Sequence, residues 1–115
     1  MLERALRIKE ARYGPEHVEV ARTLTNLGNA HEALGDARTA RDMLERALRI
    51  QEAHYGPDHP KVAKTLVNLG NACGALGDAR RKKELLERAL GIFEREYGPD
   101  HQFVRIIRSN LQLIR

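Results

Sequence analysis

Residues 2–8 read LERALRI, residues 44–50 read the same, and residues 86–92 read LERALGI. The offset between successive copies is 42 residues in both cases. Similarity within a chain at a fixed period of about 20–50 residues is typical of repeat proteins, in which each unit packs only on its neighbours. The sequence therefore predicts a repetitive architecture.

The repeat extends well beyond these seven positions. Without gaps, residues 2–43 and 44–85 are identical at 28 of 42 positions, and a third copy starts at residue 86. We therefore expect residues 1–115 to form one domain, made of a half repeat, two complete repeats and a terminal half repeat. The expected boundaries are 1–15, 16–57, 58–99 and 100–115.

Apolar residues inside each copy follow the period of an α-helix. Val20, Leu24 and Leu27 are separated by four and three residues, which places them on one helix face. No segment shows the two-residue alternation of a strand. The expected helices span residues 2–13, 17–34, 37–54, 59–76, 79–96 and 101–114. Because short links make neighbouring helices antiparallel, we predict an all-α fold, an α-solenoid of six helices in antiparallel pairs.

Glycine and aspartate mark the expected helix ends. Gly35 is suited to end one helix and Asp36 to cap the next. The turn at 55–60, which reads YGPDHP, ends the helix after that, and we expect Asp58 to cap the following one. Gly28 lies inside a helix, where glycine costs about 1 kcal/mol relative to alanine. Its recurrence one period later predicts a close approach between helices.

Several of these positions resemble the tetratricopeptide repeat. The matching residues of the first complete copy are Leu24, Leu27, Gly28, Gly35, Ala40, Leu44 and Ala47. The 42-residue length, with residues 21–28 and the turn at 55–60, is similar to the kinesin-light-chain type of that repeat. The resemblance implies that the first helix of each pair lines a concave groove, and that this groove binds a protein or an extended peptide.

The third copy departs from the pattern. Lys82 replaces Ala40 at a position that should be small and buried, and Arg108 and Gln112 replace a leucine and a glycine of the earlier copies. A more polar last copy is what a terminal, capping repeat requires. Lys82 leaves two alternatives. Its alkyl stem runs out to solvent, or it loosens its helix pair, which could then exchange between chains in a domain-swapped dimer.

The resemblance implies that the groove lies on the face of the first helices opposite the core. On that face lie Arg22, Thr25, Asn26, Asn29, Lys64, Val67, Asn68, Asn71 and Asn110. Asparagine recurs there at the repeat offset, and its amide offers a donor and an acceptor that could hold a peptide backbone. The alternative is structural, with Asn26 and Asn68 bonded to the neighbouring helix.

Charge indicates the kind of peptide. The chain has 20 Lys+Arg against 16 Asp+Glu, a net charge of +4, and Arg22 and Lys64 add positive charge on one side of the groove. An acidic peptide is therefore the expected partner, although ordinary solvated surface charge would give the same pattern. Ile106 occupies the third equivalent position, which argues against a complete clamp for a terminal carboxylate.

Two other binding chemistries are disfavoured. His17, His59 and His101 recur at the repeat offset, but packed helices place equivalent residues about 10 Å apart, whereas zinc ligands converge at about 2.0–2.3 Å from one ion. We therefore expect no metal site. The basic run at residues 80–83 could bind nucleic acid, but only 4% of the chain is aromatic, which leaves few rings to stack on bases. A solvated helix face is the expected role of this run.

We expect no enzyme and no cofactor, because the chain has neither a glycine-rich phosphate loop nor a nucleophile elbow. No stretch approaches the roughly 18 apolar residues of a membrane span. Residues 1–6 do not resemble a signal peptide, and the single cysteine, Cys73, has no partner for an internal disulfide. We therefore expect a cytoplasmic protein without a membrane partner.

Two functions remain open. The first is a scaffold module that binds a protein or peptide in its groove. The alternative is a structural or self-assembling element with no dedicated ligand. The chain opens on the second helix of a pair, which we interpret as part of a longer array or a designed module. Its apolar residues could be covered by another chain through the open repeat end. They are Leu2, Ala5, Leu6 and Ile8.

Overall fold

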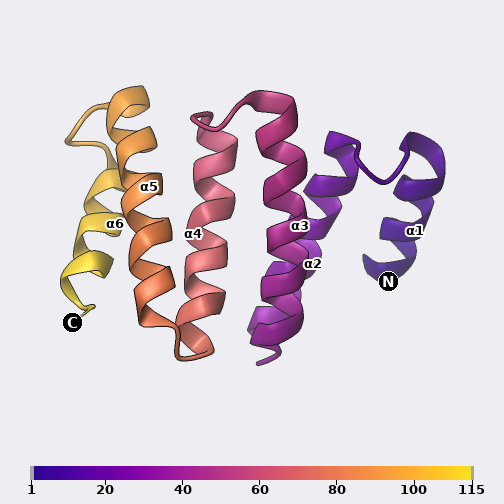
Figure 1. Cartoon of the computed structure of the whole chain (residues 1–115), viewed down its shortest axis with the longest axis horizontal. Helices are drawn as coiled ribbons and strands as arrows, with labels where there is room; N and C mark the ends of the chain where they lie inside the picture. Colours follow the sequence, from indigo (N-terminus) through magenta and orange to yellow (C-terminus); the bar gives the residue numbers. More distant parts are fainter. Residues whose placement is uncertain (1, 115) are drawn as a thin grey trace.

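The computed structural model describes residues 2–114, apart from the side chain of Leu2, and this part of the chain contains six α-helices and no strand (Figure 1). The helices are α1 (Leu2–Tyr13), α2 (Val18–Ala33), α3 (Ala37–Tyr55), α4 (Pro60–Ala75), α5 (Ala79–Tyr97) and α6 (Gln102–Gln112). The predicted all-α solenoid is confirmed, and each predicted helix end lies within two residues of the observed one. The contribution of Leu2 to an open apolar surface lies outside the described residues.

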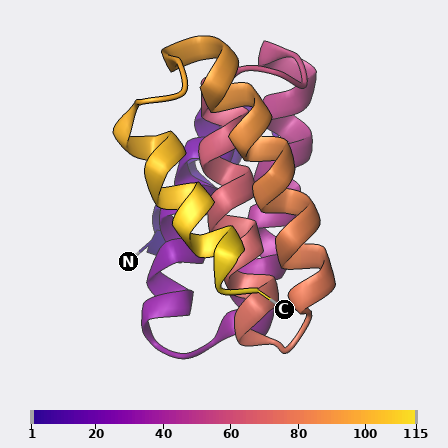
Figure 2. The same cartoon turned by 90° about the vertical axis from the view of Figure 1, so that its left-hand side faces the viewer.

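The helices form two rows in a stack of 41 × 29 × 20 Å (Figures 1 and 2). We call α2, α4 and α6 the inner helices and α1, α3 and α5 the outer helices. Each helix packs against the next one in the chain, and α2 also packs against α4. Within residues 2–114 no outer helix approaches another as closely. Within this part of the chain, α2 and α4 are therefore the one pair of non-consecutive helices in contact.

A histidine caps each inner helix. His17, His59 and His101 each accept a hydrogen bond at Nδ1 from the backbone N–H two residues further on. The donors are Glu19, Lys61 and Phe103, at 3.0, 3.1 and 3.1 Å. Each imidazole is stacked on the tyrosine four residues earlier, with ring centroids 4.4–4.6 Å apart. The tyrosine holds the ring in place for capping.

The prediction that Asp58 caps α4 is therefore wrong. His59 takes the N-cap position, because its ring reaches the first turn from one residue further along the chain. The carboxylate of Asp58 pairs instead with Arg95, at 3.3 Å. The predicted cap Asp36 is confirmed, since its Oδ1 accepts from the backbone N–H of Thr39 at 3.2 Å. This hydrogen bonding with Thr39 lowers the pKa of the exposed Asp36 carboxyl.

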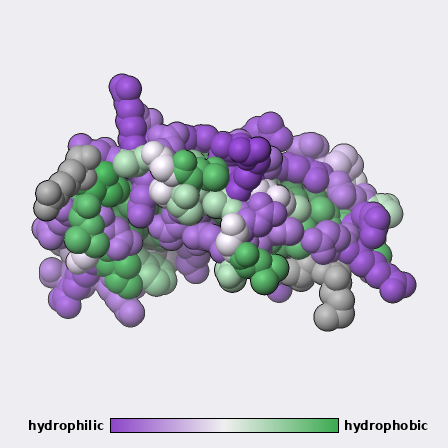
Figure 3. Space-filling view, turned by 90° about the horizontal axis from the view of Figure 1, so that it is seen from below, coloured by the Kyte–Doolittle hydropathy of each residue, from purple (hydrophilic) through white to green (hydrophobic). Residues whose placement is uncertain are grey.

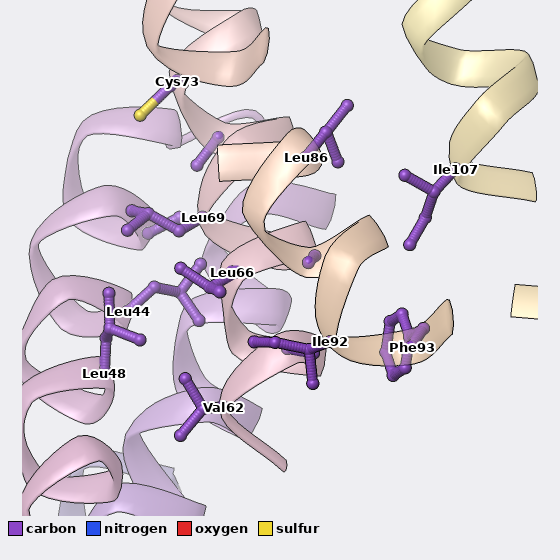
Figure 4. Close-up of a cluster of buried hydrophobic side chains, with 14 of the residues drawn as sticks. Leu44, Leu48, Val62, Leu66, Leu69, Cys73, Leu86, Ile92, Phe93 and Ile107 are labelled. Atoms are coloured by element: carbon purple, nitrogen blue, oxygen red, sulfur yellow. The ribbon is translucent and has the colours of Figure 1, made fainter. Parts of the chain in front are cut away.

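The core runs through the stack and consists mostly of leucine, isoleucine and valine from neighbouring helices (Figure 4). The predicted close approach at Gly28 is confirmed. A Cβ added there would lie 2.9 Å from Cγ of Leu44, which is fully buried. At the equivalent Gly70 the nearest atoms, in Leu86 and Lys82, would lie at 3.6 Å. At this one position the side chains of the first helix pair are therefore packed more tightly than those of the second.

Lys82 is accommodated between the two helices of the second pair. It is half-buried on α5, and a Cβ added at Gly74 would lie only 2.7 Å from its Cδ. Gly74 stands where the first copy has Glu32, so a small residue in α4 makes room for the long one in α5. Its stem thus lies against α4, and α5 remains packed along that helix. In this structure Lys82 therefore does not separate the two helices of its pair.

A recurring ion pair ties each outer helix to the one before it. Arg88 on α5 donates from Nη2 to Oε2 of Glu52 on α3, at 2.6 Å, and to the carbonyl of Pro57, at 3.1 Å. Arg46 makes the equivalent contacts one repeat earlier, at 2.7 and 3.1 Å. Each arginine therefore joins two successive repeats.

Arg108 makes the third version of this contact from a different helix. It donates from α6 to Oε2 of Glu94, at 2.6 Å, and to the carbonyl of Pro99, at 3.4 Å. Glu94 and Pro99 are the equivalents of Glu52 and Pro57. The substitution of a core leucine by Arg108 therefore gives these groups a partner on the next helix, in the terminal half repeat. It also gives the outer face of α6 the polar character expected of a cap.

Candidate functional site

Two adjacent hollows lie along the inner helices. The polar hollow, of about 360 Å³, is lined by residues of α2 and α4, with α3 behind them. The apolar hollow, of about 260 Å³, is lined by residues of α4 and α6, with α5 behind them. Lys64 borders both hollows, so together they form one row across the three inner helices.

The structure brings together six of the nine predicted groove residues. Arg22, Thr25 and Asn26 line the polar hollow, Val67 and Asn68 line the apolar hollow, and Lys64 lines both. The other three, Asn29, Asn71 and Asn110, line neither hollow. The hydroxyl of Thr25 donates to the carbonyl of Ala21 in its own helix at 3.0 Å, which occupies its proton.

The amides of Asn26 and Asn68 are free of hydrogen bonds to residues 2–114. Asn26 is exposed and Asn68 is half-buried. The alternative in which these two side chains order the stack through bonds to a neighbouring helix is therefore not supported. Both side chains line the hollows with donors and acceptors available.

Sequence reasoning missed the residues behind the inner helices. Gln51 on α3 lines the polar hollow, and Phe93, at the equivalent position on α5, lines the apolar hollow. The prediction considered only the first helix of each pair, whereas these residues lie on the second. The sequence contained a signal for these residues. The equivalent positions 9, 51 and 93 hold Lys, Gln and Phe, although each lies between an isoleucine and a glutamate that do not change.

Gln51 forms a buried hydrogen bond at the back of the polar hollow. It is 8% exposed, and its Oε1 accepts from the hydroxyl of Thr65 on α4 at 2.5 Å. Its amide nitrogen has no partner among residues 2–114. In the apolar hollow the same two positions hold Phe93 and Ile107, which both belong to the core (Figure 4).

Positive charge dominates the polar hollow. Its lining contains the cations of Arg22, Lys61 and Lys64 and one carboxylate, that of Glu19. The guanidinium of Arg22 lies 3.8 Å from Glu19, and the Arg22 side chain is 78% exposed. Nζ of Lys61 lies 3.3 Å from the hydroxyl of Tyr55. Neither lysine has an ion pair within residues 2–114. An anion placed there would therefore meet unneutralised charge.

Other candidate chemistries have little support in the described part of the chain. No group of three or more His, Cys, Asp or Glu side chains within it could hold a metal ion. None of its helices is both long and apolar enough to cross a membrane. Cys73 is buried, which raises the pKa of its thiol. In the basic run, Arg81 is bonded to Glu45 on α3 and Arg80 lies 3.7 Å from Glu84, so two of its four cations already have partners.

Known proteins share the architecture of the stack. A protein from Podosopora anserina, described as a kinesin light chain with nearly identical TPR-like repeats, superposes with a TM-score of 0.89 at 24% identity, over 96% of this chain and 52% of that one. BtubC (BKLC) from P. vanneervenii superposes with a TM-score of 0.77 at 23% identity, over 83% of this chain and 37% of that one. The present chain thus spans about half the length of the first of these proteins. At these identities the likeness shows the fold.

The sequence itself identifies the family. No match is found among curated proteins. Two family models of the tetratricopeptide repeat match residues 1–53 and 62–103, which together make up most of the chain. With the repeated helix pairs and the structural likeness to kinesin-light-chain repeats, these matches show that the chain belongs to the tetratricopeptide-repeat family.

Proposed function

We propose that this chain binds an extended segment of a partner protein along the two hollows of its inner helices. Tetratricopeptide repeats are in general scaffolds for protein interaction. The observation that carries the proposal is the pair of free amides, Asn26 and Asn68, which line adjacent hollows one repeat apart. An amide that donates and accepts at each hollow can hold the backbone of a peptide whatever its side chains are.

An acidic segment is the partner that suits the charges. Arg22, Lys61 and Lys64 border the polar hollow against the single carboxylate of Glu19. Hydrogen bonds between ionised groups are about twice as strong as those between neutral groups. Acidic side chains in the partner would therefore strengthen binding and speed association at low salt.

Self-assembly through the open repeat ends is supported less well. Ile8 on α1 is 57% exposed, but α6 presents Arg108 and the exposed Gln112 where a further helix would need leucine and glycine. Figure 3 shows one face of the molecule, on which hydrophobic atoms form separate patches among hydrophilic ones. That face therefore lacks the continuous apolar area that stable interfaces between copies usually need.

The test is a random-peptide display selection on the chain and on two double variants. The first combines Asn26→Ala with Asn68→Ala and removes both amides from the hollows. The matched control combines Asn29→Ala with Asn71→Ala, which makes the same change on the same helices outside the hollows. We expect a motif to be enriched on the chain and on the control variant and lost on the first variant. No enrichment, or equal enrichment on all three proteins, would refute groove binding.

A further inference from the structure

The two hollows are built on equivalent positions but have opposite chemistry. We propose that Gln51 and Phe93 determine which side chain of a bound peptide each hollow accepts, with a carboxylate placed over Gln51 and a large apolar side chain over Phe93. This inference rests on the peptide-binding function proposed above. It adds which two side chains the peptide must carry and how far apart they must lie.

The polar hollow has a built donor for a carboxylate. Gln51 is more than nine-tenths buried, and its Oε1 is already bonded to the hydroxyl of Thr65. The hydrogen bond orients the amide and leaves its nitrogen as a donor without a partner in residues 2–114. Lys61 and Lys64 border the same hollow. A carboxylate oxygen would therefore meet one neutral donor held in place by Thr65 and at least one lysine cation.

The apolar hollow is suited to one large apolar side chain. Phe93 is 2% exposed and lies with its ring centroid 5.3 Å from that of Phe103. Ile106, on α6, is 48% exposed and lines the same hollow. The volume of about 260 Å³ is below the range of roughly 300–1,000 Å³ that is typical of small-molecule sites. When one apolar side chain of the peptide is buried there, apolar surface of both the peptide and the hollow is removed from water, which favours binding.

The repeat geometry sets the spacing of these two side chains. Directly packed helices lie about 8–10 Å apart, and α2 packs against α4, so we assign about this distance to the step from one hollow to the next. A peptide in the polyproline II conformation rises about 3.1 Å per residue and returns to the same side every third residue. Positions i and i+3 of such a peptide, about 9 Å apart, would therefore reach both hollows. The predicted ligand carries a large apolar residue and an acidic residue three positions apart.

The experiment exchanges the chemistry of one hollow and leaves the other unchanged. The double variant Gln51→Phe with Thr65→Ile gives the polar hollow the pair that Phe93 and Ile107 form one repeat later. The single variant Gln51→Glu keeps the shape and the acceptor for Thr65 but replaces the free donor with a carboxylate. Lys9→Gln, at the equivalent position of the first copy and outside both hollows, is the matched control.

The probes are fluorescent proline-rich peptides with Phe and Glu three residues apart, in both orders, and the same peptides with Leu in place of Glu. Fluorescence anisotropy measures their affinity, and circular dichroism checks that each variant is folded. Of the two Glu peptides, one order of Phe and Glu will bind more tightly. We expect the chain and the Lys9→Gln control to bind that peptide with an affinity about tenfold higher than its Leu version, as one charge-assisted hydrogen bond would give. Gln51→Glu should abolish this preference, and the double variant should reverse it.

The two proposals fail in different ways. If the preference between Glu and Leu is the same in the chain and in folded Gln51→Glu, Gln51 does not determine specificity, even though the groove binds peptides. If the display selection enriches a motif but none of the spaced probes binds, the spacing argument is overturned. If neither the selection nor the probes give binding, the groove function itself is wrong.

Discussion

Gly28 and Gly70 occupy equivalent positions, but the structure predicts opposite effects when each is replaced by alanine. Within a helix, alanine is favoured over glycine by about 1 kcal/mol. At Gly70 the added Cβ would lie 3.6 Å from Leu86, which is an ordinary contact. Gly70→Ala should therefore raise the free energy of unfolding by roughly 0.5–1 kcal/mol.

At Gly28 the steric cost exceeds this gain. The added Cβ would lie 2.9 Å from Cγ of Leu44 and 3.4 Å from the backbone oxygen of Ala40. Leu44 is fully buried and its Cγ is a branch point, so the side chain cannot swing away without moving its neighbours. Overpacking of this kind costs about 1–3 kcal/mol. After the helix-propensity gain is subtracted, Gly28→Ala should lower the free energy of unfolding by about 1 kcal/mol.

Urea and thermal unfolding, followed by circular dichroism at 222 nm, measure both changes. For a domain of this size, about 1 kcal/mol corresponds to a shift of roughly 4 °C in Tm. The variants should therefore shift Tm in opposite directions, and Gly28→Ala combined with Leu44→Ala should destabilise the chain by less than the sum of the two single changes. Equal shifts of the same sign would show that the two glycine positions are packed alike, and would refute the steric argument for Gly28.

Three further predictions test the caps and the end of the stack. His59→Ala should destabilise the chain to urea by about 1 kcal/mol, whereas His59→Asp, which keeps an acceptor at the N-cap, should cost less. Hydrogen bonding with Thr39 lowers the pKa of the Asp36 carboxyl in the folded chain below its unfolded-state pKa of about 3.8. The stability that Asp36 contributes is therefore present above pH 3.8 and is lost as the pH falls through the lower folded-state pKa. Asp36→Ala should therefore show a smaller loss of stability in this acid range than the unchanged chain. Arg108→Leu removes the partner of Glu94 and exposes a leucine, so light scattering should detect more self-association; a monomer at every concentration would contradict this.

The architecture was predictable from the sequence because the same signal is repeated along the chain. Leu24 and Leu66 keep their places in copies 42 residues apart, so an irregular residue in one copy does not hide the helix period. The capping of α4 was not predictable in the same way. Both Asp58 and His59 have side chains that can accept from a helix N-terminus, and Asp is the commoner choice. The stacking of His59 on Tyr55, at 4.5 Å, favours the histidine, and this contact depends on the shape of the turn.

The groove was predictable on one side only. A helical wheel shows which side of an inner helix is polar, and it indicated Arg22, Asn26 and Lys64, which line the polar hollow. It does not show what lies behind the gap between two inner helices, because Gln51 and Phe93 belong to other helices and are themselves buried. Burial usually favours similar apolar residues in every copy, since equivalent positions have equivalent neighbours. A position that changes from Lys to Gln to Phe between unchanged neighbours therefore indicates that something other than packing differs along the stack. In a short array of near-identical repeats, a buried position that differs between copies is the sequence signal from which binding subsites are best predicted.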